Sequence, residues 1–217
     1  MGDGSRIGDG DDLAAIVLAG GRARRLGGDM KPARVVGGTP LLVRVLEAVR
    51  GAGSRVVVGP DELDGLLPAG VLRTLEEPPG AGPVAAIAAG LAVLPARPDV
   101  VAVLGGDLPF VDEATLWTVR EALTTSAAEA AVAVDETGRP QWMLAMWRAV
   151  VLERRIGALG TSGGLDGRGM RELAAGVRIA EVRLAELHQA EAPPPWFDCD
   201  TEDDLRRAEE WARGNAG

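Results

Sequence analysis

The greatest concentration of potential chemistry lies between Arg22 and Arg34, where five of the six charged residues are basic. One of them, Lys31, is the only lysine of the sequence. The segment follows Gly20 and Gly21, and paired glycines let the backbone come close to a ligand while consecutive N–H groups form an anion-binding concavity. The pattern predicts a phosphate-binding loop. The alternative is a solvated arginine-rich loop.

This loop does not follow the two best-known phosphate-binding patterns. The pattern G-x-x-x-x-G-K-[ST] is absent because Lys31 does not directly follow Gly27. No G-x-G-x-x-G follows the first apolar run at 13–18. The sequence therefore argues against a P-loop ATPase and against a Rossmann dehydrogenase.

A carboxylate follows another apolar run. Residues 100–104 are all valine, alanine or leucine, and Gly105 and Gly106 separate them from Asp107. The two glycines leave the backbone free to present that carboxylate at a strand end. Because Mg²⁺ is held by one or two carboxylates together with substrate phosphates, Asp107 is a candidate metal ligand. The alternative is a turn-forming aspartate before Pro109.

An acidic cluster lies near the C-terminal end, from Asp198 to Asp204. In an extended segment Asp198 and Asp200 share one face. They are therefore candidates for a second metal ligand or an acceptor site, and Asp200 is the stronger candidate. The acids after Thr201 have a structural explanation, because Thr201 can cap a final helix whose positive N-terminal end favours acidic residues.

The elements that must position these residues alternate between apolar runs and helical patterns, which is typical of βαβ units. The apolar runs predict strands at 13–18, 55–58, 71–75, 100–104, 131–134, 141–147, 177–184 and 196–200. Helical patterns start at Pro40, after an N-cap at Thr39, and at 83–94, 112–123, 148–159, 170–175 and 201–213. We expect an α/β fold, with a Rossmann-like, mostly parallel open sheet and helices on both faces. One domain is expected to span 13–213, after a flexible tail at 1–12.

Composition narrows the class of protein further. The 217 residues are 47% hydrophobic and carry a formal net charge of −9, which argues against sequence-independent binding to nucleic acid or to anionic membranes. One cysteine and one histidine exclude an internal disulfide and zinc sites made of four cysteines or of two cysteines and two histidines. No signal-peptide pattern is present, so we expect a cytoplasmic protein with small-molecule substrates.

A serine hydrolase is a rival interpretation. Residues 160–164 match G-x-S-x-G, and Asp166 and His188 follow in the order that hydrolases use. The nucleophile elbow requires a strand before the serine, whereas 148–159 carries a helical pattern. The single cysteine, Cys199, lies between two aspartates that raise its thiol pKa, so it is expected to be a small buried residue rather than a nucleophile.

The arginine-rich loop as a whole resembles a family signature. Residues 18–32 closely resemble the pattern L-A-G-G-x-x-x-R-[ML]-G-G, followed by a lysine, of the molybdenum cofactor guanylyltransferase (MobA-like) nucleotidyltransferases. The resemblance implies that Arg25 and Lys31 hold the triphosphate. It also implies nucleotide contacts at Leu18, Ala19, Gly20 and Gly21. Fixed cations and N–H groups would stabilise the charge that develops during transfer at phosphorus.

Two further segments resemble the nucleotide half of the same family. Residues 105–110 resemble its metal-binding segment, which implies Asp107 as an Mg²⁺ ligand, while Asp200 stays the stronger candidate for the second ligand. Residues 76–86 resemble its G-P-L-A-G segment, which lies beside the base and ribose. The positions implied to contact the nucleotide there are Gly82, Pro83 and Glu77, the last in place of the family's aspartate.

Substrate preference is indicated by three features. Guanylyl members commonly carry Asn-x-Asn where this chain has Asp198-x-Asp200, which is more like cytidylyl relatives. Gly20 resembles the guanylyl form, since cytidylyl relatives usually carry alanine there, and we favour GTP over CTP. Residues 138–145 resemble the family's Q-P-L-x-A strand in the acceptor half. A pterin ring could stack there on Trp142 or Trp147, although large aromatic side chains are more often part of the core.

The resemblance extends over 13–212 and implies a Mg²⁺-dependent guanylyltransferase. It would transfer GMP from GTP to the terminal phosphate of molybdopterin bearing molybdenum, release pyrophosphate, and supply molybdoenzymes or their chaperones. The acceptor phosphate has a second pKa of about 6 and needs no general base. The alternatives are a cytidylyltransferase, another small-phosphate nucleotidyltransferase, and a non-catalytic nucleotide-binding module. The joint presence of Arg25, Lys31 and Asp107 argues against the last of these.

Overall fold

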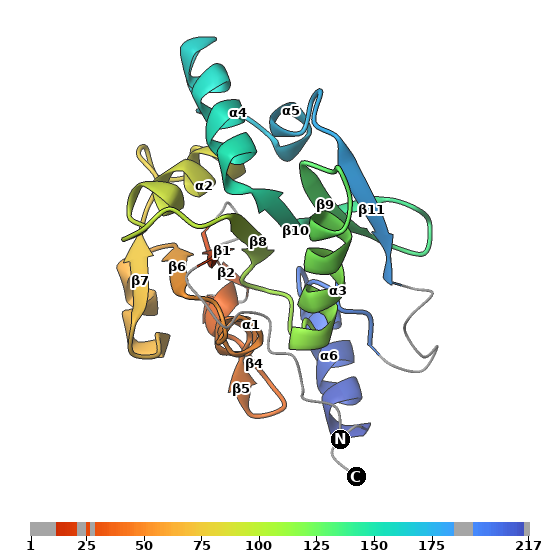
Figure 1. The fold of residues 1–217 in the computed structure, drawn as a ribbon. Coiled ribbons are helices and arrows are strands. Elements are labelled where there is room, and N and C mark those ends of the chain that lie inside the picture. The colour runs from red at the N-terminus through yellow and green to blue at the C-terminus, as the bar shows by residue number, and fades with distance from the viewer. Residues whose placement is uncertain (1–11, 21–24, 27–28, 185–192, 215–217) are drawn as a thin grey trace.

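A seven-stranded open sheet organises the chain (Figure 1). The computed structural model describes residues 12–20, 25–26, 29–184 and 193–214. The strands are β1 (Leu13–Leu18), β6 (Ser54–Val58), β7 (Val71–Thr74), β8 (Val100–Gly105), β9 (Ala130–Val134), β10 (Pro140–Arg148) and β11 (Ile179–Arg183). Their order across the sheet is β11-β9-β10-β8-β1-β6-β7. All neighbouring pairs are parallel except those of β10, which runs antiparallel to both β8 and β9.

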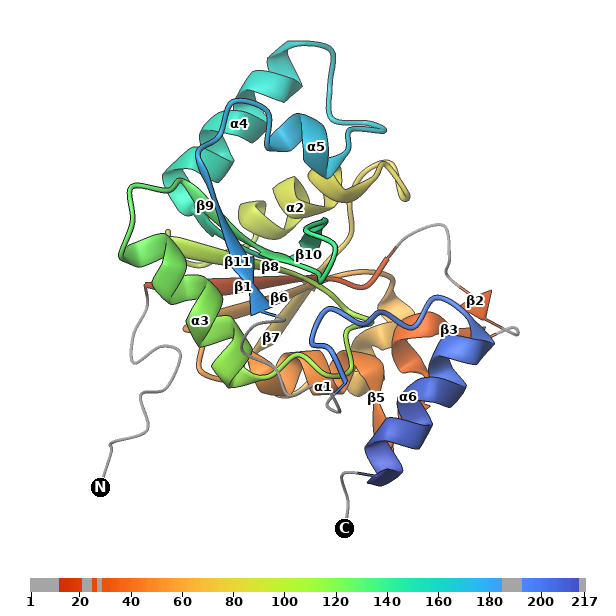
Figure 2. The ribbon, with the colours of Figure 1, turned by 90° about the vertical axis from the view of Figure 1, so that its right-hand side faces the viewer.

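Helices cover both faces of this sheet, as Figure 2 shows. The helices α2 (Pro83–Ala92), α4 (Ala149–Thr161) and α5 (Met170–Leu173) lie on one face. The helices α1 (Leu41–Ala48), α3 (Glu113–Thr124) and α6 (Glu202–Gly214) lie on the other side. Within the ranges described, no helix combines the length and the hydropathy needed to span a bilayer.

The side chains of β1 point alternately to the two faces of the sheet, and both faces are covered, which explains why the strand is apolar throughout. Leu13, Ala15 and Val17 pack into the core that α1 and α3 cover, whereas Ile16 packs into the opposite core with residues of α2. Successive side chains of a strand point to opposite faces. A strand buried on both faces therefore needs a continuous apolar run, which is what parallel sheets show.

The expected α/β fold with a mostly parallel open sheet is confirmed, and strand boundaries differ by one or two residues. The strand expected at 141–147 is confirmed as β10, which runs antiparallel to β8. The strand expected at 196–200 is wrong, because this segment contains a turn and no strand. The position beside β9 is already taken by β11. Residues 196–200 instead connect to α6, and the Cys199 N–H donates to the Asp107 carbonyl oxygen at 3.3 Å.

The start of α1 also differs from expectation, since Thr39 is not its N-cap. Thr39 and Pro40 form the short strand β5, which pairs with β4 (Val35–Val36). Gly37 and Gly38 between them have φ values of 56° and 79°. Two consecutive left-handed residues suit a two-residue hairpin turn. The glycine pair therefore makes a hairpin rather than a helix entry, and α1 begins one residue later than expected.

Candidate active site

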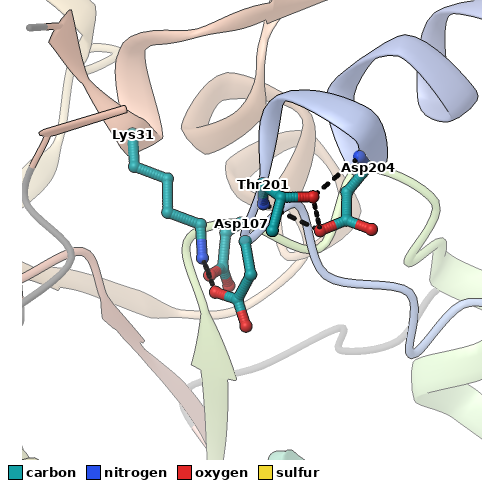
Figure 3. A network of polar contacts seen from close by, with 5 residues as sticks. Lys31, Asp107, Thr201 and Asp204 are labelled. Atoms are coloured by element: carbon teal, nitrogen blue, oxygen red, sulfur yellow. Dashed lines mark hydrogen bonds and ion pairs between the residues drawn. The ribbon is translucent and has the colours of Figure 1, made fainter. Parts of the chain in front are cut away.

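Three charged side chains from distant parts of the sequence meet at one edge of the sheet. Lys31 begins the short 3₁₀ helix η1 (Lys31–Ala33), Asp107 follows β8, and Asp200 precedes α6. The Lys31 Nζ lies 2.5 Å from Asp107 Oδ2 and also donates to an Asp200 carboxylate oxygen. Figure 3 shows the Lys31 side chain extended toward Asp107. Exposure of the side chains rises from 7% for Lys31 to 25% for Asp107 and 59% for Asp200.

The parallel pairing of β1 with β8 brings these groups together. Both strands end at the same edge, and the Gly106 N–H donates to the Leu18 carbonyl oxygen at 2.9 Å. A Cβ on Gly106 would lie 3.2 Å from the Ala19 Cβ, tighter than most real contacts, so glycine permits this close approach. Asp107 therefore emerges beside the segment that follows β1.

The charges around Lys31 favour its protonated, positively charged form. Burial alone would lower the pKa of Lys31, but the charge and hydrogen bonds of Asp107 and Asp200 outweigh it and raise the pKa above its ordinary value. The pKa of Asp198 is also raised, first by desolvation and then by the nearby Asp200 and Asp107 carboxylates. Two carboxylates thus contact one ammonium group, with the Asp198 carboxyl nearby, so the negative charge exceeds the positive charge.

The same carboxylates suit a divalent metal ion. Asp107 and Asp200 offer hard oxygen donors, which Mg²⁺ prefers. In the part of the chain that the structure describes, no three or more side chains of the metal-binding types form a complete ligand group. The donor set therefore fits an ion that takes its remaining ligands from phosphates and water.

A cleft of about 500 Å³ opens beside Asp107, and we call it the glycine cleft. Its lining residues are Leu18, Gly20, Val58, Glu76, Gly80, Gly82, Pro83, Ala86, Gly105, Asp107, Met143 and Gly167. Five of these twelve are glycines, which leaves backbone close to any ligand. Gly82 has a φ of 98°, and Pro83 is the first residue of α2. The cleft is therefore shaped mainly by backbone.

Several residues predicted to bind nucleotide lie in this cleft. Leu18, Gly20, Gly82, Pro83 and Asp107 all line it. Ala19 is buried and does not line it. Gly21 and the side chain of Arg25 lie outside the described residues, although the Arg25 backbone forms part of β2 (Arg25–Leu26). These contacts and roles stay predictions.

The acid in the cleft differs from the one singled out from the sequence. Glu77 is exposed and does not line the cleft, whereas Glu76 is buried and does. One carboxylate oxygen of Glu76 accepts a hydrogen bond from the Gly80 N–H at 2.8 Å. Adjacent acids after a strand give no sequence signal for which one turns inward. Glu76 thus positions the glycine-containing turn, a role that the sequence did not reveal.

A larger cavity of about 800 Å³ meets the glycine cleft, and we call it the aromatic cavity. Its lining residues are Asp107, Leu108, Glu136, Arg139, Pro140, Gln141, Trp142, Met143, Leu144, Met170, Arg171, Pro194, Trp196, Phe197, Asp198, Asp200, Arg207 and Trp211. It shares Asp107 and Met143 with the glycine cleft. Trp142 lines this cavity, but Trp147 is fully buried in the core and is not available for stacking. The metal-binding candidates therefore lie where two ligand-sized spaces meet.

The described residues contain neither a serine hydrolase site nor a reactive cysteine. Ser162 follows α4 directly, so no strand precedes it as a nucleophile elbow requires. His188 lies outside the described residues. Cys199 is buried, and desolvation, followed by the charge of Asp107, raises its pKa to about 12. Such a thiol is almost entirely protonated at neutral pH and is a poor nucleophile.

The acids at the start of α6 fulfil the structural role expected of them. The Asp204 N–H donates to Thr201 Oγ1 at 3.1 Å, and Asp204 Oδ2 accepts from the Thr201 N–H at 2.7 Å (Figure 3). This reciprocal pair satisfies N–H groups at the helix start. Thr201 therefore caps α6, next to Asp200, and Asp204 completes the capping box.

Comparison with known proteins agrees with this arrangement. The model of the MobA-like NTP transferase domain matches residues 15–180. A molybdenum cofactor guanylyltransferase from Nitrobacter hamburgensis is 29% identical over 208 residues, covering 93% of this chain and 95% of that protein. A probable molybdenum cofactor guanylyltransferase from Mycobacterium bovis is 32% identical over 146 residues, covering 65% of this chain and 71% of that protein.

Solved structures share the fold. The molybdopterin-guanine dinucleotide biosynthesis protein A of Archaeoglobus fulgidus has a TM-score of 0.70 and 22% identity, covering 93% of this chain and 99% of that one. A 2-C-methyl-D-erythritol 4-phosphate cytidylyltransferase from Thermus thermophilus has a TM-score of 0.65 and 22% identity, covering 93% and 99%. These likenesses show the fold that the chain shares with both proteins. The family match, which spans most of this chain, shows that it is a nucleotidyltransferase and belongs to the MobA-like NTP transferase family.

Proposed function

We propose that this nucleotidyltransferase transfers GMP from GTP to the terminal phosphate of molybdopterin bearing molybdenum, with release of pyrophosphate. The observation that carries the proposal is the meeting of the glycine cleft and the aromatic cavity at Asp107. A nucleotide in the first and a phosphorylated acceptor in the second would bring their phosphates to the same carboxylate. Relatives named molybdenum cofactor guanylyltransferase support the choice of substrates.

The chemistry requires no general base. An oxygen of the acceptor phosphate donates an electron pair to the α-phosphorus of GTP and forms a new P–O bond. The bond from the α-phosphorus to the α,β-bridging oxygen breaks, and pyrophosphate leaves with that electron pair. Because a phosphomonoester has a second pKa of about 6, the attacking group is mostly dianionic at neutral pH. This fits a site built from Asp107, Asp200 and Lys31 without a histidine among the described residues.

The remaining roles are binding of the phosphate groups and of the metal ion. In this proposal Lys31 and Arg25 neutralise triphosphate charge, and the backbone of Gly20 and its neighbours approaches the phosphates. Asp107, with Asp200, would hold Mg²⁺, which supplies Lewis-acid stabilisation of the phosphate oxygens when bound. One solved structure of similar fold, from Mycobacterium tuberculosis at 20% identity, carries manganese according to its title, which agrees with a divalent ion.

The competing substrate is CTP, and a specific observation favours it. The chain carries Asp198-x-Asp200 beside the site, which resembles cytidylyl relatives, and a cytidylyltransferase shares the fold. Gly20 lines the glycine cleft, and its resemblance to the guanylyl form supports GTP. Guanylyl transfer also agrees with the names of the curated relatives. We therefore retain GTP as the donor.

Pyrophosphate release tests this function directly. The protein is mixed with Mg²⁺, molybdopterin bearing molybdenum, and GTP, CTP, ATP or UTP in separate reactions. We expect pyrophosphate and the dinucleotide product with GTP, and no product without acceptor. Turnover only with CTP, or only with an unrelated phosphate, contradicts the proposed substrates while leaving the family unchanged. The proposal also includes a cytoplasmic location. It further includes handover of the product to molybdoenzymes or their chaperones, and co-purification with a molybdoenzyme would test this handover.

A further inference from the structure

Three guanidinium groups in the aromatic cavity have no acidic or carbonyl partner in the described part of the chain. They belong to Arg139 before β10, Arg171 in α5 and Arg207 in α6, and all three side chains are exposed. Figure 2 shows α5 and α6 on opposite sides of the sheet, with β10 between them. The three cations therefore approach the cavity from different directions.

These arginines contrast with most others of the chain. Arg73, for example, pairs with Asp64 at 2.5 Å, and the Arg148 Nε donates to the Ala128 carbonyl oxygen at 2.9 Å. These three arginines line one cavity, and their N–H donors are bound to no described acid or carbonyl group, so they are available to a ligand.

Arg207 is also held in place without using its N–H donors. Its guanidinium carbon lies 4.5 Å from the centre of the Trp211 ring and 5.8 Å from that of Phe197. Cation–π contact orients the group through its face and leaves the N–H edge free. A guanidinium presented in this way is preorganised for a carboxylate, phosphate or similar anion.

The acids of the same cavity do not neutralise these cations. Asp107 and Asp200 both bind Lys31 at the junction with the glycine cleft. In the described part of the chain, neither Glu136 nor Asp198 forms an ion pair with any of the three arginines. In the proposed function the reacting phosphate lies at that junction, beside Lys31. The arginines are therefore available for negative charge elsewhere on the acceptor.

We propose that Arg139, Arg171 and Arg207 form a second anion-binding site, which selects acceptors whose flat ring framework carries an anionic group in addition to the reacting phosphate. This inference rests on the proposed function, because it takes the aromatic cavity as the acceptor site. The cavity volume of about 800 Å³ lies in the range of pockets for small molecules. Trp142 and Trp196 also line it and provide flat apolar surface for a ring.

Two commercially available ring compounds separate this inference from the transfer reaction. Pterin-6-carboxylate has a flat ring, one carboxylate and no phosphate, and pterin has the ring alone. Binding of each is measured by quenching of tryptophan fluorescence at an ionic strength of about 0.15 M, which screens long-range charge. We expect the wild-type protein to bind the carboxylate about tenfold more tightly than pterin, as a hydrogen-bonded charge would give.

Single variants locate the source of that preference. In R139Q, R171Q and R207Q we expect the advantage of the carboxylate to fall severalfold, while the affinity for pterin changes little. The matched control is R183Q, because Arg183 is exposed on β11, lacks a described partner and does not line the cavity. The thermal midpoint of each variant verifies folding. Equal affinity of the wild type for the two compounds, or an equal loss in R183Q, overturns the inference.

The same panel keeps the two proposals distinguishable. If the wild type binds pterin-6-carboxylate through the three arginines but releases no pyrophosphate with GTP and molybdopterin, the second anion-binding site stands and the proposed reaction fails. If transfer occurs and the arginine variants keep the wild-type KM for the acceptor and the wild-type affinity for pterin-6-carboxylate, the reaction stands and the inference fails.

Discussion

The glycine cleft and the aromatic cavity share Asp107 but are built from different groups. Glycine backbone and small apolar side chains shape the first, whereas arginine, tryptophan and carboxylate side chains shape the second. Backbone groups recognise features that every nucleotide has, and their geometry depends little on side-chain substitutions. Side chains recognise one acceptor and can be exchanged without changing the fold. If the glycine cleft holds the donor and the aromatic cavity the acceptor, as proposed, the choice of acceptor can change while the donor site stays the same.

Loss of the carboxylate that both spaces share should have the largest effect. For D107N we expect transfer to fall by about 10³-fold, because the charge that would hold the metal ion and orient both phosphates is removed. GTP binding should weaken much less, since the glycine cleft remains. Pyrophosphate release and GTP titration measure the two effects. The control is D99N, because Asp99 is exposed immediately before β8, at the opposite end of that strand. Equal transfer by D107N and the wild type would place the reaction elsewhere.

Removal of the ammonium group at the junction should have the next largest effect. We expect K31M to lower transfer by about 10²-fold through lost stabilisation of phosphate charge. Asp107 and Asp200 would also lose their counter-charge, which we expect to cost about 1–3 kcal/mol of stability, less than a fully buried pair because Asp200 is largely exposed. Urea unfolding measures the second effect. K31R keeps the charge and should recover most of the stability. Unchanged stability in K31M would mean that the ion pairs contribute nothing in solution.

Crowding the glycine cleft should affect only the donor. A Cβ on Gly82 would lie 3.4 Å from the Arg168 carbonyl oxygen, at a φ of 98° that alanine rarely adopts. For G82A we therefore expect the KM for GTP to rise about tenfold, on the scale of a lost charged hydrogen bond, with little change in the KM for the acceptor. G70A is the matched control, because Gly70 has a φ of 81°, no atom within 4 Å of its added Cβ, and lines neither the glycine cleft nor the aromatic cavity. Equal changes in both KM values would contradict separate donor and acceptor sites.

The glycine cleft follows from local sequence pattern more directly than the aromatic cavity does. Asp107 follows β8 at once, Lys31 comes thirteen residues after the end of β1, and parallel strands present their carboxyl ends at one edge. The order of apolar runs and charged residues along the chain is therefore enough to predict that these two residues lie near one another. The choice between Glu76 and Glu77 depends on the path of one turn, which hydrophobic pattern does not specify.

The aromatic cavity arises from contacts that local patterns do not reveal. Arg139, Arg171 and Arg207 are separated by tens of residues and come from a turn and two helices that meet only through tertiary packing. Alternating residues at 196–200 predict a strand, yet in the structure the segment leads into α6 and the Cys199 N–H donates to the Asp107 carbonyl oxygen. Alternation indicates a preference for extended backbone and does not say whether a partner strand is available.

A substitution in the turn beside the aromatic cavity should have the smallest effect, and it should affect only the acceptor. Asp135 Oδ1 accepts hydrogen bonds from the Thr137 N–H and hydroxyl and from the Arg139 N–H, so it shapes the turn that carries Arg139. For D135A we expect the KM for the acceptor to rise about threefold, because loss of these hydrogen bonds loosens the turn without removing a group that contacts the acceptor. The KM for GTP should not change. D64A is the control, because Asp64 is an exposed acid that lines neither space.

The contribution of Asp135 to the free energy of unfolding should depend on pH in a predictable direction. Its hydrogen bonds, first from the Thr137 side chain and then from the Arg139 backbone, lower the pKa of Asp135 below the ordinary value of 3.8. A lowered pKa in the folded state means that the carboxylate contributes stability above about pH 3.8, and that this contribution is lost as the pH falls through the folded value. The difference in unfolding free energy between the wild type and D135A should therefore be constant from about pH 5 to 7 and shrink below about pH 3.8. A difference that grows on acidification would show that the hydrogen bonds favour the protonated acid, which would contradict the lowered pKa of Asp135.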